Sequence, residues 1–166
     1  MDKKINCISI EPTKSTAEYS KKYGFKVVQK FFTKKFSNDL KLKYGKADLL
    51  IGNNVLAHVP DILDFIQGVK NILKKDGTAV FEFPHLLNLL KYKQFDTIYH
   101  EHYSYLSVIF LVKILKSSRL KIYKIKKINT HGGSLRVYLA HENSKIKLDN
   151  SVSNIISEEK KNSLHK

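Results

Sequence analysis

The densest group of side chains suited to chemistry lies near residue 100. Between Tyr99 and Tyr105 there are three tyrosines, two histidines and one carboxylate, with Glu101 standing between His100 and His102. A carboxylate beside an imidazole can fix its tautomer and raise its basicity. A phenol can donate a hydrogen bond to a developing enolate oxygen. The segment therefore contains the groups needed to remove a proton from a carbon next to a carbonyl.

Two other interpretations of this segment stay open. Histidines two positions apart lie on one side of the chain only where the chain is extended. This spacing differs from that of HExxH, whose four-residue spacing suits a helical zinc site. Metal binding is therefore disfavoured, and a polar aromatic loop without chemistry is the structural alternative.

Polar residues also follow two of the expected strands. Glu11 comes directly after the apolar run Ile5–Ile10, and Asn53, Asn54 and His58 follow the third expected strand. Open α/β sheets bind ligands at the carboxyl ends of their strands, where an acid can accept hydrogen bonds from ribose hydroxyls. Asparagines offer donors and acceptors, and a histidine offers a titratable group. The alternatives are a solvated turn carboxylate and an ordinary loop histidine.

Arg136 follows the pair Gly132–Gly133 in a run of alternating side chains. The glycines permit positive φ or a close backbone approach. Alternation along a strand turns Arg136 away from the face of Leu135 and Val137. Its partner is either an anionic ligand or an acidic neighbour, and the sequence leaves both open.

The scaffold for these residues is expected to be α/β. Short apolar runs bounded by turn residues indicate strands, and apolar residues at helical spacing indicate helices. Strands are expected at residues 5–10, 25–28, 47–52, 78–83, 120–128 and 134–141. Helices are expected at residues 13–23, 34–44, 61–73, 84–94 and 105–116, with a turn at 74–77 and a loop at 53–60. Strands separated by helices predict a parallel sheet, and the last two predict an antiparallel hairpin at its edge.

Composition limits the remaining possibilities. The chain has 166 residues, of which 42% are hydrophobic, and this is the length of one folded domain. Its apolar runs are shorter than the roughly 20 residues of a membrane span. Residues 1–4 lead into a run too short for a signal peptide. Cys7, the single cysteine, excludes an internal disulfide framework and a cysteine-rich zinc site, so a cytoplasmic location is expected.

The net charge of +15 raises nucleic acid and anionic membranes as partners. Only Arg119 and Arg136 are arginines among the 30 basic residues. Arginine reads bases and phosphates by bidentate hydrogen bonds, whereas lysine is a solvated point charge. The lysines are also spread along the chain, which is typical of a solvated surface. A basic nucleic-acid-binding module remains the alternative function.

Five segments, taken in order, resemble the S-adenosylmethionine-dependent sugar C-methyltransferases, which methylate nucleotide-linked 4-keto-deoxysugars. The segments are IEPT (10–13), NNVLAHVPD (53–61), FEFPHLL (81–87), QFDTIYHEHYSY (94–105) and THGGSLRVYLAH (130–141). The resemblance spans residues 5–142. It implies a class I methyltransferase fold, with a Rossmann-like sheet whose last two strands form a hairpin.

The resemblance also implies roles for individual residues. Those that hold the cofactor S-adenosylmethionine would be Glu11 at the ribose, with Asn53 and Asn54 lining the pocket. Those that act on the sugar would be His58 near the substrate carbonyl and the catalytic residues Tyr99, Glu101 and His102. His102 would be the base that removes the proton next to the ketone, and the resulting carbanion would attack the methyl group. No metal site is implied in this part of the enzyme.

The sequence departs from this family at both ends. Full-length members begin with a cysteine-rich zinc region, then carry a first strand with a Gly-rich cofactor loop, and they end with a further α/β domain. The sequence resembles the middle of such an enzyme, with a partial methyltransferase domain over residues 1–142. Residues 143–166 would be a polar tail that starts a truncated C-terminal region, loose or helical without a partner.

These departures predict an incomplete sheet. The first strand of the family lies between the second and the fourth, so its absence would leave two unpaired edges in the middle of the sheet. We therefore expect an incomplete cofactor site without zinc, and weak or absent activity alone. A complementary polypeptide would repair both defects. The alternative is a non-catalytic subunit or remnant of a split enzyme.

Overall fold

The computed structural model describes residues 5–165, so the N-terminal lead at residues 1–4 and the last residue of the expected tail lie outside it. The described residues form these strands: β1 (Ile8–Ile10), β2 (Lys26–Val28), β3 (Ala47–Asn53), β4 (Leu73–Pro84), β5 (Leu120–Ile128) and β6 (Ser134–His141). The α-helices are α1 (Lys14–Lys22), α2 (Lys34–Tyr44), α3 (Ile62–Ile72), α4 (Leu86–Tyr92), α5 (Val108–Ser117) and α6 (Asn150–Lys161). Two short 3-10 helices are η1 (Leu56–His58) and η2 (Phe95–Thr97).

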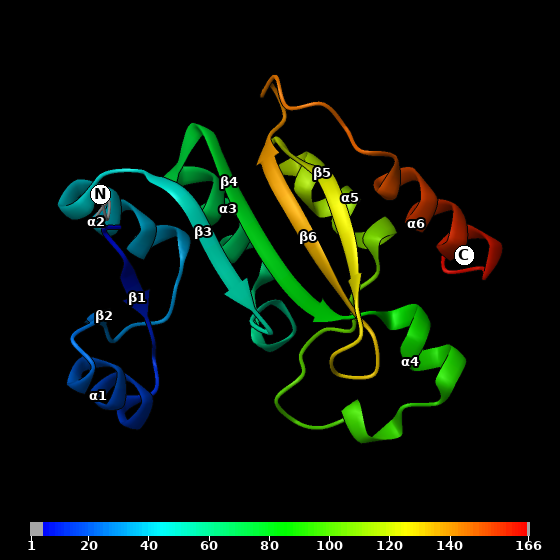
Figure 1. Ribbon diagram of the computed structural model, residues 1–166, viewed down its shortest axis with the longest axis horizontal. Helices are drawn as coiled ribbons and strands as arrows, with labels where there is room; N and C mark the ends of the chain where they lie inside the picture. Colours follow the sequence, from blue (N-terminus) through cyan, green and yellow to red (C-terminus); the bar gives the residue numbers. More distant parts are fainter. Residues whose placement is uncertain (1–4, 166) are drawn as a thin grey trace.

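The strands form two sheets. Four of them pair in the order β3-β4-β6-β5, with β3 parallel to β4 and with β6 antiparallel to β4 and β5. The other two, β1 and β2, pair in parallel with each other. Figure 1 shows β3 and β4 side by side, with the β5–β6 hairpin beyond β4. The predicted α/β class, parallel strands and C-terminal antiparallel hairpin are confirmed.

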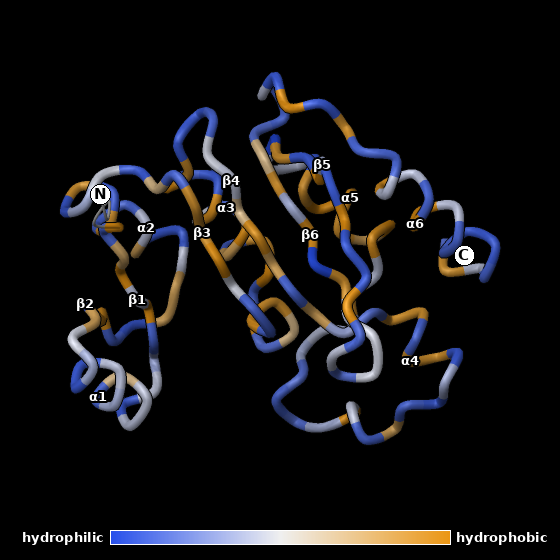
Figure 2. The backbone as a smooth tube through the Cα atoms, viewed as in Figure 1, coloured by the Kyte–Doolittle hydropathy of each residue, from blue (hydrophilic) through white to orange (hydrophobic). Residues whose placement is uncertain are grey.

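One face of the four-stranded sheet carries the core. The register places Phe81 beside Gly52 of β3 and Val137 of β6, and both Phe81 and Val137 are fully buried. Apolar side chains of α3, α5 and α6 pack in the same cluster. In Figure 2 the hydrophobic residues concentrate accordingly along the central strands. The opposite face of β3 is uncovered, since Leu49 is 55% and Ile51 63% exposed.

The β1–β2 pair is attached to the rest through helix α2. Ile10 of β1, Val28 of β2 and Leu50 of β3 pack against one apolar cluster built on Phe36 and Leu40. Side-chain hydrogen bonds from Asn71 of α3 to α2 reinforce this attachment. In Figure 1, β1 lies between β2 and β3. Among the described residues, however, β1 pairs only with β2 and β3 only with β4, so each keeps one unpaired edge.

Two expectations for local structure are wrong. The turn expected at residues 74–77 lies within β4, which already begins at Leu73. The register slips in this stretch, because Ala47 pairs with Leu73 while Leu49 pairs with Thr78. The expected tail contains α6, which is neither loose nor without a partner. Its residues Ile155 and Glu159 are buried, and the helix packs on α5 and β5.

Gly52 is a position where β3 and β4 leave no room for a side chain. A Cβ atom there would lie 2.7 Å from Cε1 and 2.9 Å from Cδ1 of Phe81. We predict that Gly52→Ala lowers the free energy of unfolding by about 1–3 kcal/mol, the usual cost of overpacking. Chemical denaturation measures this loss. Gly52→Ala and Phe81→Leu together should cost less than the sum of the two, and strict additivity would contradict the contact.

Candidate functional site

The candidate cofactor residues lie at the carboxyl ends of strands, as predicted. Glu11 follows β1, and its carboxylate Oε1 accepts a hydrogen bond from the Thr13 backbone N–H at 2.8 Å, beside the start of α1. The other oxygen, Oε2, has no hydrogen-bond partner among residues 5–165. Asn53 ends β3 with an exposed side chain. Glu11 and Asn53 thus keep acceptor or donor groups free for a ligand.

Asn54 holds an unsatisfied polar atom at the end of β3. Its φ of 53° is left-handed, and its backbone N–H donates to the Glu82 carbonyl oxygen at 2.7 Å. Its side-chain Nδ2 donates to Nε2 of His131 at 3.3 Å, whereas its Oδ1 is buried and accepts no hydrogen bond from a described residue. A buried acceptor without a donor costs on the order of 1–3 kcal/mol. A ligand with a hydroxyl or N–H donor would remove that cost.

Arg136 has an acidic neighbour rather than a free anion-binding position. It stands opposite Glu82 in the β4–β6 register, and its Nε and Nη2 donate to Glu82 Oε2 at 3.1 and 2.9 Å. Thr130 Oγ1 donates to the other oxygen at 3.2 Å. The hydrogen bond with Glu82 raises the pKa of the Arg136 guanidinium. Sequence reasoning missed Glu82, although an acid inside an apolar strand was the available signal.

The loop between β5 and β6 closes one side of the site. His131, Gly132 and Gly133 have φ values of 49°, 71° and 104°. The Gly132 carbonyl accepts a hydrogen bond from Gln94 Nε2 at 2.8 Å, and a Cβ atom on Gly132 would collide with the Gln94 side chain. Asn88 Nδ2 of α4 donates to the Gly133 carbonyl at 3.1 Å. The glycines therefore let this loop lie directly against the segment that contains α4 and η2.

His102 has a defined tautomer. Its Nδ1 lies 2.8 Å from the Thr97 carbonyl oxygen, which can only accept, so the proton is on Nδ1. Its Nε2 therefore carries a lone pair in the neutral ring, and this lone pair accepts the Tyr99 hydroxyl at 3.2 Å. The ring centroids of Tyr99 and His102 are 4.3 Å apart. The result is a phenol–imidazole pair in which Nε2 of His102 faces the phenol.

His58 lies beside this pair. Its Nδ1 donates to the Glu101 carbonyl oxygen at 3.0 Å, and its ring centroid is 4.7 Å from that of His102. The backbone N–H groups of Tyr103 and Ser104 both donate to the Ala57 carbonyl, at 2.8 and 3.2 Å. The structure therefore brings His58 against Tyr99 and His102, although it comes from a distant part of the sequence.

Glu101 does not contact the imidazoles through its carboxylate, as the sequence suggested it could. Its side chain is exposed, and among the described residues no hydrogen bond joins its carboxylate to a histidine. Backbone carbonyl oxygens of Thr97 and Glu101 fix the two tautomers instead. The reason is local geometry, because turns at residues 99–101 point the Glu101 carbonyl inward and its side chain outward. A catalytic role of the Glu101 carboxylate stays a prediction.

The enclosed space behind His102 is small. It is lined by apolar side chains, including Phe83 and Leu106, and has a volume of about 10 Å³. Such a volume holds at most one water molecule. A substrate must therefore bind on the open side of the pair, where Tyr99 is 44% and Tyr103 63% exposed.

Two further observations concern metals and membranes. Within residues 5–165, no three His, Cys, Asp or Glu side chains are grouped so that they could hold a metal ion. In the same range, no helix has the length and apolarity needed to cross a bilayer.

Comparisons with known proteins agree with this architecture. The family model for the methyltransferase domain matches residues 2–124. C-methyltransferase NovU from Streptomyces niveus is 31% identical over 153 residues, which are 92% of this chain and 36% of that protein. The chain therefore spans about a third of the length of this relative.

Solved structures show the same fold at low identity. A SAM-dependent methyltransferase from Thermotoga maritima aligns with a TM-score of 0.62 and 17% identity, over 82% of this chain and 72% of that chain. PKMT2 from Rickettsia typhi, solved with AdoHcy, aligns with a TM-score of 0.63 and 11% identity, over 89% of this chain and 46% of that chain. The fold is thus an α/β, Rossmann-like methyltransferase fold.

The Glu82–Arg136 pair provides a test of the site's framework. The Glu82 side chain is 8% exposed and that of Arg136 38%, so Glu82→Gln removes the charge of the buried partner from a half-buried ion pair. We expect a fall of several degrees in the melting temperature. Asp48→Asn is the matched control, because it removes the carboxylate of an exposed pair with Lys74, in which Asp48 is 82% exposed. Equal shifts for the two variants would show that the Glu82 contact is no stronger than a surface ion pair.

Proposed function

Because the chain belongs to the methyltransferase-domain family, we propose that it carries out C-methyl transfer from S-adenosylmethionine to a nucleotide-linked 4-keto-deoxysugar. The observation that carries this proposal is the Tyr99–His102 pair, in which Nδ1–H of His102 donates to the Thr97 carbonyl and Nε2 lies 3.2 Å from the Tyr99 hydroxyl. The C-methyltransferase relative supports transfer to carbon. The lone, exposed Cys7 accords with a reducing cytoplasm as the place of action.

The residues at the strand ends fit the cofactor. The free Glu11 oxygen would accept ribose hydroxyls, as acids at this position do in doubly wound folds. The unsatisfied Asn54 Oδ1 would accept a further donor, and the exposed Asn53 side chain would line the same pocket. When bound, S-adenosylmethionine supplies an electrophilic methyl group to the sugar carbon.

The proton transfer follows from the two tautomers. On substrate binding, the Tyr99 hydroxyl turns from His102 to the sugar's carbonyl oxygen and donates to it. The His102 Nε2 lone pair is then free to take the proton from the carbon next to the ketone, while Nδ1–H keeps its bond to the Thr97 carbonyl. His58 keeps its Nδ1–H on the Glu101 carbonyl, so the Nε2 of its neutral ring would accept a hydrogen bond from a hydroxyl of the sugar. Positioning and charge stabilisation are the contributions of these residues.

We further propose that a polypeptide segment outside residues 1–166 completes the sheet between β1 and β3. Both strands have an unpaired edge there, and an unpaired edge is a template for another strand. The neighbouring Leu49 and Ile51 side chains are exposed and apolar, so the same segment would cover them. The chain matches 36% of NovU, so this relative has further regions from which such a segment could come. Without the segment, the chain would be a non-catalytic subunit.

The base assignment is tested by turnover of a keto-deoxysugar nucleotide in the chain co-expressed with the parts of NovU outside the matched region. We expect His102→Ala to lower turnover on the order of 10²–10⁴-fold, the usual contribution of a general base. Tyr99→Phe should cost about 10²-fold, the usual loss of an oxyanion donor. His100→Ala, an exposed neighbour, is the control and should be unchanged. Undiminished turnover of His102→Ala would contradict the assignment.

Cofactor binding gives a separate test of sheet completion. We expect isothermal titration calorimetry to detect weak or no binding of S-adenosylmethionine to the chain alone, because the chain has no Gly-rich phosphate or cofactor loop. Co-expression with the remaining NovU regions should strengthen binding by about tenfold or more. Micromolar affinity of the isolated chain would overturn the proposal that another segment is needed.

A further inference from the structure

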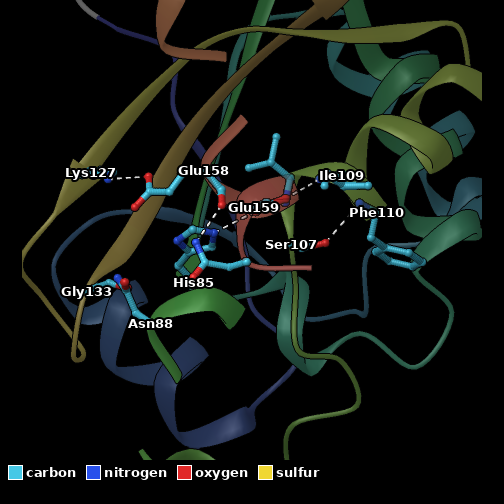
Figure 3. A network of polar contacts seen from close by, with 11 residues as sticks. His85, Asn88, Ser107, Ile109, Phe110, Lys127, Gly133, Glu158 and Glu159 are labelled. Atoms are coloured by element: carbon cyan, nitrogen blue, oxygen red, sulfur yellow. Dashed lines mark hydrogen bonds and ion pairs between the residues drawn. The ribbon is translucent and has the colours of Figure 1, made fainter. Parts of the chain in front are cut away.

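Helix α6 contains a fully buried carboxylate, Glu159, which contacts residues on both sides of the segment that holds Tyr99 and His102. Glu159 is 0% exposed, and its Oε1 accepts hydrogen bonds from His85 Nε2 at 2.8 Å and from the Val108 backbone N–H at 2.7 Å. Its Oε2 accepts the Ile109 backbone N–H at 2.8 Å. Figure 3 shows His85 and Ile109 pointing toward the Glu159 carboxylate. No step of the proposed reaction uses Glu159.

The three donors belong to the two ends of one segment. His85 directly follows β4, and Val108 begins α5. The residues between them form an excursion whose two ends lie side by side. There the Leu86 N–H donates to the Leu106 carbonyl at 3.1 Å. We call residues 86–107 the catalytic segment, since it contains Tyr99 and His102. Glu159 therefore joins the two ends of the catalytic segment, His85 at one end and the start of α5 at the other.

The electrostatics explain why a carboxylate stands at this point. The first N–H groups of a helix have no partner within it, and they carry the positive end of the helix dipole. In α5, Glu159 satisfies Val108 and Ile109, and the Ser107 side chain satisfies Phe110 at 3.2 Å. His85 supplies the remaining donor. An apolar residue could fill the space, but it would leave buried donors from both ends of the catalytic segment unpaired.

We infer that Glu159 is a positioning residue, which sets the place of His102 by joining His85 to the start of α5. This inference rests on the proposed role of His102 as the base. The coupling is geometric, because the far end of the catalytic segment, which contains His102, is held by hydrogen bonds to η1, including those of Tyr103 and Ser104 to the Ala57 carbonyl and of His58 to the Glu101 carbonyl. If His85 and the start of α5 move apart, the middle of the catalytic segment moves as well. The hydrogen bond from Nδ1–H of His102 to the Thr97 carbonyl then changes in length or direction.

The test compares Glu159→Gln with Glu158→Gln. In the first variant the new amide would have the right size but only one acceptor oxygen, and it would turn an N–H group toward donors. Glu158 is the preceding residue on α6, and its carboxylate pairs with Lys127 at 2.7 Å on the surface, where Glu158 is 40% exposed. The first substitution thus alters the buried network, and the second alters only the outside of the same helix.

The readouts are imidazole NMR spectra and amide hydrogen exchange. In Glu159→Gln we expect His102 to lose its single Nδ1–H tautomer, and the Tyr103 and Ser104 amides to exchange about tenfold faster. In the chain co-expressed with the remaining NovU regions, turnover should fall about 10²-fold at little change in KM, as for a displacement of about 1 Å. Glu158→Gln should leave all of these measurements unchanged. If Glu159→Gln only lowers the melting temperature, with the His102 spectrum and exchange rates of the parent, the inference is wrong.

If the Glu159→Gln protein does not fold, a second pair of variants, at His85, tests the same inference. His85→Gln keeps an N–H donor for Glu159, whereas His85→Leu removes it. We expect the His102 signal to be native in the first and mixed in the second, and identical spectra would overturn the inference. The NMR and exchange measurements do not depend on catalysis. A changed spectrum with unchanged turnover would therefore refute His102 as the base while leaving the positioning role in place.

Discussion

Hydrogen bonding along both edges of β4 is the constraint on which the rest of the structure depends. This strand pairs in parallel with β3 and in antiparallel with β6. Its carboxyl end then serves three parts of the site: the Glu82 carbonyl holds Asn54, the Glu82 carboxylate holds Arg136, and the His85 N–H donates to the Gly133 carbonyl. A buried strand must satisfy all of its polar groups, and β4 does so by fixing the loops around it.

The candidate catalytic centre is assembled by backbone oxygens rather than by acids. Carbonyl groups of Thr97 and Glu101 orient His102 and His58, and a carbonyl cannot be titrated at any ordinary pH. The tautomers are therefore set by the path of the chain. This makes the path itself important for the site, and explains why a buried carboxylate on a distant helix, Glu159, matters for the place of His102.

Among the described residues, the division of the strands into two sheets leaves unpaired strand edges between β1 and β3. The β1–β2 pair is held by apolar packing of α2 on α3, without strand pairing to β3. Side-chain packing keeps the pair in place, but it leaves amide and carbonyl groups of two strands without partners in the sheet. Exposed Leu49 and Ile51 add apolar surface next to this opening. Both features favour association with another extended segment.

Periodicity and turn residues act locally, so they alone predict the order of the elements and the edge of the sheet at which polar residues gather. The helices predicted at 34–44 and 61–73 and the final hairpin agree with the structure nearly to the residue. Local patterns could not assign partners to polar groups. Arg136 meets Glu82 across 54 residues, and His85 meets Glu159 across 74. Only the folded chain decides such pairs, since the sheet register and the docking of α6 choose which donors and acceptors are buried together.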